Sequence, residues 1–164
     1  MISREEVRAM LESVPFGGLQ ERVSVESLAF GRVKLRFKVS GDSSLTRPGG
    51  TVSGPALFAL ADLAMWTVVS STRGPSPLSV TTSATIDFLR KPAPERDLLA
   101  TGEVLKNGQR LVVGRVLITS EGSASSGAAA NNAHDGSPPP GNDVVAAASV
   151  TYSVPPSHFD GKGQ

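Results

Sequence analysis

A single acidic residue interrupts a long apolar segment of this sequence. Residues 54–69 read Gly-Pro-Ala-Leu-Phe-Ala-Leu-Ala-Asp-Leu-Ala-Met-Trp-Thr-Val-Val, and Asp62 is the only ionisable group among them. Burying an unpaired carboxylate is costly, so Asp62 requires either a partner or a function. It lies too far into the segment to cap a helix, but the fold could bring Arg47 or Arg73 beside it as a salt-bridge partner. Alternatively, Asp62 faces a cavity and acts there as a general base or nucleophile.

Gly54, at the start of the same segment, could supply the complementary group. Ser53 or Gly54 can cap a helix, and Pro55 suits its first turn. Because Pro55 has no N–H, Gly54 is the best single donor at the positive end of the helix dipole, where a free N–H can stabilise an oxyanion. The same residue types also begin ordinary helices, so this signal is weak when taken alone.

The spacing of these two residues adds a geometric constraint. Gly54 and Asp62 are eight residues apart, which is about 12 Å along a helix. A reacting carbonyl must lie roughly 3 Å from its donor and close to the attacking group. Gly54 and Asp62 of the same helix therefore cannot easily act on one carbonyl group. We predict that Gly54 of one chain meets Asp62 of another, in a two-fold homodimer that can pair further into a dimer of dimers.

The elements that must position these residues form one α+β domain over residues 1–154. The apolar segment predicts a helix buried on every side. Ser3 and Glu6 predict a capping box at the start of a short N-terminal helix. Alternating apolar and polar residues predict two strands within 22–39, joined near Gly31, and further strands at 78–89, 98–105, 109–119 and 144–154. Between two of these strands, Asn107-Gly108 predicts a tight type I′ turn. An antiparallel sheet wrapped around the long helix is the simplest packing.

Two segments fall outside the predicted core. Residues 122–143 are rich in Gly, Ser, Ala, Asn and Pro and predict a disordered insertion, and residues 155–164 predict a flexible tail. They contain His134 and His158, the only histidines of the chain. We therefore expect no imidazole in the core, which argues against a Ser-His-Asp triad or a histidine metal site. No metal site is expected.

Composition narrows the function further. The 164 residues carry a net charge of +1 and include no cysteine, which excludes a disulfide framework and a cysteine nucleophile. So balanced a charge argues against nucleic acid or a membrane surface as partner. Residues 2–8 lack the apolar run of a secretory signal, so an intracellular, cytoplasmic location is expected. Residues 54–69 as a membrane span are less favoured, because the segment is short and holds a charge.

The motif residues resemble a known family. Gly54 to Asp62, followed by Thr85-Ile86-Asp87-Phe88-Leu89-Arg90, is similar to hotdog-fold acyl-CoA thioesterases of the phenylacetate-degradation-protein type. The resemblance covers roughly residues 20–121 and 144–154. It implies hydrolysis of an acyl-CoA thioester at a dimer interface, with coenzyme A as part of the substrate and no separate cofactor. It further implies that Asp62 activates water or attacks the thioester, and that the Gly54 N–H binds the thioester oxygen.

The sequence departs from the family pattern at the start of the helix. The usual His-Gly-Gly appears here as Ser53-Gly54-Pro55, within a Thr-Val-Ser-Gly-Pro motif, and Arg47 stands where related enzymes often have asparagine. The assisting polar position on the following strand falls on Thr81, or on Ser83 if the alignment slips by two residues. An exposed threonine with no role is an equally good interpretation of Thr81.

The resemblance also suggests which residues bind the substrate. The phosphates of coenzyme A need cations, which Arg90-Lys91 or the pair Lys106 and Arg110 could supply. An acyl tunnel would be lined by residues such as Phe58, Met65 and Trp66. Arg47 and Ser53 complete the predicted substrate-binding set.

Three functions are compatible with these residues. The first is hydrolysis of an acyl-CoA thioester by Asp62 with Gly54. A hydratase or dehydratase acting on acyl thioesters is less favoured, because that chemistry in related folds relies on a histidine. A non-catalytic module that binds acyl chains or acyl-CoA stays open, because Ser53 and Pro55 depart from the usual motif.

Overall fold

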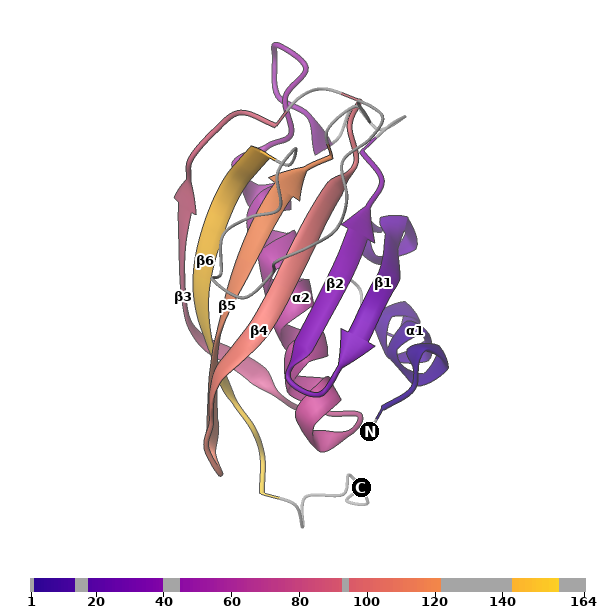
Figure 1. Ribbon diagram of the computed structural model, residues 1–164, viewed down its shortest axis with the longest axis vertical. Helices are drawn as coiled ribbons and strands as arrows, with labels where there is room; N and C mark the ends of the chain where they lie inside the picture. Colours follow the sequence, from indigo (N-terminus) through magenta and orange to yellow (C-terminus); the bar gives the residue numbers. More distant parts are fainter. Residues whose placement is uncertain (1, 14–17, 40–44, 93–94, 122–142, 157–164) are drawn as a thin grey trace, which may run out of the picture.

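The computed structural model describes residues 2–13, 18–39, 45–92, 95–121 and 143–156 (Figure 1). Six antiparallel strands form one sheet in the order β1-β2-β4-β5-β6-β3. The elements in chain order are α1 (Arg4–Glu12), the 3₁₀ turn η1 (Leu19–Arg22), β1 (Val23–Ala29), β2 (Arg32–Phe37), α2 (Gly54–Arg73), β3 (Val80–Phe88), β4 (Leu98–Asn107), β5 (Leu111–Ser120) and β6 (Asp143–Ser153). The sheet curves around α2, and α1 lies beside β1 (Figure 1). This confirms the predicted hotdog fold.

Some predictions fall on parts of the chain outside the described residues. They concern the insertion, of which residues 122–142 are not described, and the tail from residue 157 onward. His134 and His158 belong to these two segments.

The capping box at the N-terminus is confirmed. The Ser3 side chain accepts a hydrogen bond from the Glu6 N–H at 3.1 Å, and Glu6 Oε2 accepts one from the Ser3 N–H at 2.7 Å. These bonds satisfy two of the N–H groups that a helix start leaves without partners. Val7, Met10 and Leu11 are buried, as their helical spacing predicts.

The prediction that α2 is buried on every side is right for its second half and wrong for its start. All residues from 63 to 71 are buried, whereas Pro55 and Phe58 are exposed and Ala59 and Asp62 are only half-buried. These four residues are spaced i, i+3, i+4 and i+7, so they lie on one side of the helix. We call them the open stripe. The helix has the length and apolarity of a membrane span, but its burial identifies it as the core helix of this domain.

The hairpin between β4 and β5 is present, but its predicted turn is wrong. Neither Asn107 nor Gly108 has the positive φ that a type I′ turn requires. The β4–β5 register shifts by one residue between Val104 and Lys106, so β4 continues through Asn107. The connection therefore contains three residues, 108–110, in place of the predicted two.

Two glycines allow the sheet to lie close against α2. A Cβ built on Gly102 of β4 would lie 2.8 Å from Val68 Cγ2, and one built on Gly114 of β5 would lie 2.6 Å from the Glu103 carbonyl oxygen and would also collide with Met65 Sδ. Side chains at these two positions would hold the strands away from the helix.

Gly114→Ala should therefore destabilise the fold, by about 1–3 kcal/mol in the free energy of unfolding measured in urea. The backbone oxygen of Glu103 cannot move aside without disturbing the β4–β5 ladder. Ser149→Ala, a small change at an exposed position of β6, is the matched control and should change stability by less than about 0.5 kcal/mol. Equal effects of the two substitutions would contradict close packing at Gly114.

One arginine on the outer face of the sheet forms ion pairs with three carboxylates. Arg36 Nε lies 2.6 Å from Glu26 Oε1, and its Nη1 lies 2.6 Å from Glu121 Oε2 and 3.2 Å from Asp97 Oδ2. The network joins β1 and β2 to residues just beyond the ends of β4 and β5. The hydrogen bonds from Arg36 lower the pKa of the Glu121 carboxyl below its ordinary 4.5.

A carboxyl with a lowered pKa stabilises the fold above its ordinary pKa and loses that contribution as the pH falls through its folded value. Glu121→Gln should therefore destabilise the protein by up to about 1 kcal/mol at pH 7, because the pair is partly exposed, and the difference should shrink as the pH falls below about 4.5. Urea unfolding at pH 7, 5 and 3 measures this. Glu95→Gln, at an exposed position with no ion pair in the described part of the chain, serves as control. A difference that does not change with pH would contradict the ion-pair account.

Candidate active site

Two hydroxyl groups bind the same oxygen of Asp62. Thr81 Oγ1 donates to Asp62 Oδ1 at 2.6 Å, and the Tyr152 hydroxyl donates to Oδ1 at 2.7 Å. The Tyr152 hydroxyl also lies 3.2 Å from the backbone oxygen of Asp62. The antiparallel register of β3 and β6 places Thr81 opposite Tyr152. Three elements, the consecutive α2 and β3 and the distant β6, therefore meet at this carboxylate.

Asp62 has no cationic partner among the described residues. Its Oδ2 accepts no hydrogen bond from them either, and the side chain is half-buried on the open stripe. The Arg73 guanidinium instead donates to Asn107 Oδ1 at 2.9 Å and to the Gly108 carbonyl. Arg47 is exposed, in a turn that its backbone closes with Thr51 and Gly50. The salt-bridge explanation of Asp62 is therefore wrong for both arginines.

Tyr152 is suited to remain a donor to this carboxylate. Its ring is buried, and burial together with the negative charge of Asp62 raises the pKa of its phenol well above the ordinary 10. The hydroxyl therefore keeps its proton at neutral pH. The sequence alone did not predict a role for Tyr152. Alternation along β6 could have pointed Tyr152 inward, but no local signal links it to Asp62.

Gly54 begins α2 with an unused donor. Ser53 is the N-cap, and its side chain accepts a hydrogen bond from the Ala56 N–H at 3.4 Å. The Gly54 N–H has no acceptor among the described residues. The Phe88 ring lies beside Gly54, and Thr51 Oγ1 donates to the Pro92 carbonyl at 3.2 Å. At eight residues from Asp62, Gly54 is about 12 Å away along the same helix, so one chain does not bring the two together.

The remaining predicted site residues separate into different regions. Thr81 and Ser83 are both exposed, but among the described residues only Thr81 of the two hydrogen-bonds Asp62. Phe58 lies on the open stripe, whereas Met65 is fully buried, with its sulfur against Gly114. Trp66 is also buried, and its indole N–H donates to the Ser76 carbonyl.

The two predicted basic pairs lie at opposite ends of α2. Arg90 and Lys91 are exposed just after β3, between Phe88 and Pro92, which lie beside residues 51–54. Lys106 and Arg110 flank the β4–β5 connection, near Arg73. Only the first pair is close to Gly54.

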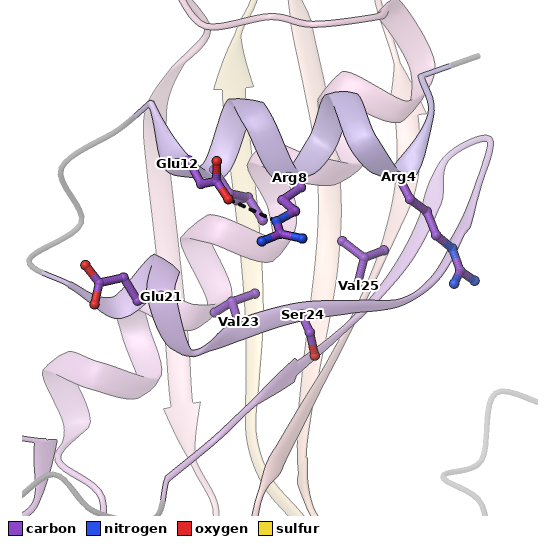
Figure 2. A pocket seen from close by; sticks show the side chains of 8 residues that line it. Arg4, Arg8, Glu12, Glu21, Val23, Ser24 and Val25 are labelled. Atoms are coloured by element: carbon purple, nitrogen blue, oxygen red, sulfur yellow. Dashed lines mark hydrogen bonds and ion pairs between the residues drawn. The ribbon is translucent and has the colours of Figure 1, made fainter.

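The larger hollow of the single chain lies away from this cluster, and the one beside Asp62 is narrow. A narrow crevice between α2, β3 and β6 is lined by Phe58, Ala61, Asp62, Ala84, Thr85, Ala148 and Val150. A larger pocket of about 610 Å³ lies between α1 and β1, where Arg8 pairs with Glu12 (Figure 2). None of its lining residues belongs to the Asp62 cluster. Among the described residues no group of three His, Cys, Asp or Glu side chains could hold a metal ion.

The sequence matches a protein-family model, and the structure matches solved structures. Residues 49–126 match the family model of the thioesterase superfamily. A candidate thioesterase from Silicibacter sp. TM1040 has a solved structure that is 38% identical, with a TM-score of 0.73, and the alignment covers 95% of this chain and 94% of that one. No curated protein sequence matches the chain. The chain therefore belongs to the thioesterase superfamily.

More distant solved structures share the fold. A hypothetical thioesterase from Streptococcus pneumoniae, solved with coenzyme A, is 21% identical, with a TM-score of 0.67 and coverage of 94% of this chain and 98% of that one. The Escherichia coli PaaI protein of the phenylacetic acid degradation operon is 19% identical, with a TM-score of 0.69 and coverage of 92% and 91%. At these identities the likeness concerns the fold alone, and it agrees with the predicted resemblance to PaaI-type proteins.

Proposed function

We propose that the protein hydrolyses an acyl-CoA thioester to a free acid and coenzyme A, with Asp62 as the residue that activates water or attacks the thioester. The observation that carries this proposal is the state of the Asp62 carboxylate. It lies half-buried on the open stripe, held by two hydroxyls and by no cation of the described chain. Such a carboxylate keeps its negative charge available for a proton or for a carbonyl carbon.

The reaction needs a second group for the thioester oxygen. When water attacks, its oxygen bonds to the carbonyl carbon, its proton passes to Asp62, and negative charge develops on the carbonyl oxygen. The free N–H of Gly54, at the positive end of α2, can stabilise this charge. Cleavage of the C–S bond then releases the coenzyme A thiolate, which recovers the proton. In the nucleophilic variant Asp62 attacks the carbonyl carbon and the C–S bond breaks, which releases the coenzyme A thiolate. Water then hydrolyses the resulting anhydride to the free acid and the Asp62 carboxylate, and the proton it gives up goes to the thiolate.

The family and the cations near Gly54 support the proposed substrate class. The Streptococcus pneumoniae protein of the same fold was solved with coenzyme A. Arg90 and Lys91 lie at the Gly54 end of α2, where they can contact phosphate oxygens of a coenzyme whose thioester reaches the helix start. Arg110, at the opposite end, is less well placed for the same coenzyme within one chain.

Completing this site requires a second copy of the chain. Gly54 and Asp62 of one chain are too far apart for one carbonyl, and the crevice beside Asp62 is too narrow for an acyl group. The open stripe and the edge strand β3, with exposed Val80 and Phe88, lie uncovered beside Asp62. Pairing of two copies along β3 would cover these apolar groups and bring each Gly54 toward the partner's Asp62. The proposed enzyme is a homodimer with two equivalent sites.

The purified protein should release free thiol from at least one of a panel of short, medium, long and aryl acyl-CoAs. Asp62→Asn should lower kcat at least about hundredfold, because the amide cannot accept the proton or attack. Glu5→Gln is the control, since Glu5 is an exposed carboxylate of α1, which lies beside β1 at the opposite edge of the sheet from β3. No turnover of any substrate, or an Asp62→Asn variant as fast as the parent, would overturn the mechanism. Tight acyl-CoA binding without turnover would favour the non-catalytic module.

A subunit-mixing experiment tests the shared site. Gly54→Pro removes the proposed donor, and proline is well tolerated at the first helical position, where Ser53 already has the extended ψ of 150° that precedes proline. The substitution also adds a ring beside Phe88, whose Cζ would lie 3.3 Å from the new Cβ. Gly54→Pro and Asp62→Asn should each be inactive. After random mixing, half of the dimers are mixed and each mixed dimer has one intact site of two, so about a quarter of the parent activity should return.

Light scattering of the parent gives the control for this mixing experiment. It should show a dimer or a larger even assembly. A monomer, or mixed variants that stay inactive although they exchange subunits, would contradict a site that two chains share.

A further inference from the structure

The geometry points to a positioning role for Tyr152: together with Thr81, it fixes Asp62 Oδ1 so that Oδ2 is the oxygen that reacts. This inference rests on the proposed function, because it assigns roles to the two oxygens of the proposed catalytic carboxylate. Tyr152 lies outside residues 49–126, which match the superfamily model, so the family match does not point to it. The evidence is the contact geometry of the cluster alone.

Both donors converge on one oxygen and leave the other free. A carboxylate oxygen offers two lone pairs, and those of Oδ1 are taken by the hydroxyls of Thr81 and Tyr152, at 2.6 and 2.7 Å. Oδ2 has no donor among the described residues. The carboxylate is therefore held in one orientation, with a single oxygen available to water or to a carbonyl carbon. Fixed orientation of a reacting group is a large part of catalysis.

Tyr152 is the more rigid of the two donors. Its side chain is 3% exposed, on the inner face of β6, whereas Thr81 is exposed on the edge strand β3. The Tyr152 hydroxyl also lies 3.2 Å from the backbone oxygen of Asp62. It therefore holds the Asp62 side chain in a fixed position relative to the backbone of α2. A buried ring has few torsions to adjust, which favours a constant hydrogen-bond geometry. Its neutral hydroxyl adds no charge that would compete with Asp62 for the proton.

Tyr152→Phe removes the hydroxyl and keeps the ring. We expect kcat for thiol release to fall about tenfold to hundredfold, the usual cost of losing one hydrogen bond to a charged group, with KM unchanged. Thr67→Val is the matched control, because the Thr67 hydroxyl is equally buried in α2 but donates to the Leu63 carbonyl. It should leave kcat unchanged. An unchanged kcat in Tyr152→Phe, or an equal loss in Thr67→Val, would overturn the positioning role.

A spectroscopic measurement tests the contact between Tyr152 and Asp62 independently of enzymatic activity. Tyr152 is the only tyrosine of the chain, so absorbance near 295 nm reports its ionisation alone. The charge of Asp62 opposes that ionisation, so Asp62→Asn should make the phenol ionise at lower pH than in the parent, whereas Glu5→Gln should not. Identical curves for Asp62→Asn and the parent would overturn the Tyr152–Asp62 contact whatever the activity. Absence of turnover in the parent would instead overturn the proposed function.

Discussion

The architecture of this protein depends on the packing of α2 against a sheet that wraps only part of the way around it. Gly102 and Gly114 let β4 and β5 approach the helix closely, and its residues from 63 to 71 are buried as a result. The sheet ends at the edge strand β3, so one side of the first two helical turns is left without cover (Figure 1). Asp62 lies on that side. Because the sheet ends there, Asp62 is only half-buried in the single chain.

The way in which Asp62 is stabilised limits its chemistry. A carboxylate paired with arginine would be held mainly by charge and would be a weak base. Here the partners are neutral hydroxyls from β3 and β6, which satisfy one oxygen without neutralising the group. Tyr152 remains a donor because burial and the neighbouring carboxylate oppose its ionisation. Under the proposed function, the same two strands that shape the core also leave one carboxylate oxygen available for the thioester.

Much of the fold could be predicted because its signals are local. The Ser3–Glu6 capping box depends on residues three positions apart, and the strands follow from alternation of side chains along each segment. The prediction of a type I′ turn at Asn107-Gly108 was wrong because the β4–β5 register shifts by one residue, which moves the connection to residues 108–110. That shift is set by pairing between the strands. The prediction that α2 is buried on every side was wrong for a similar reason. Composition gives the apolarity of a helix but not the reach of the sheet that covers it.

The sequence by itself determined that one carboxylate would stand in an apolar helix and that Gly54 would begin that helix with a free donor. Both follow from residue types and from the fixed rise of an α-helix, which also set their separation. Only the tertiary structure decided what binds Asp62. Thr81 and Tyr152 lie 19 and 90 positions away in the chain, and they meet Asp62 because β3 and β6 pair in one register over the same turn of α2. Contacts between residues so far apart depend on the packing of the whole sheet, which no local pattern encodes.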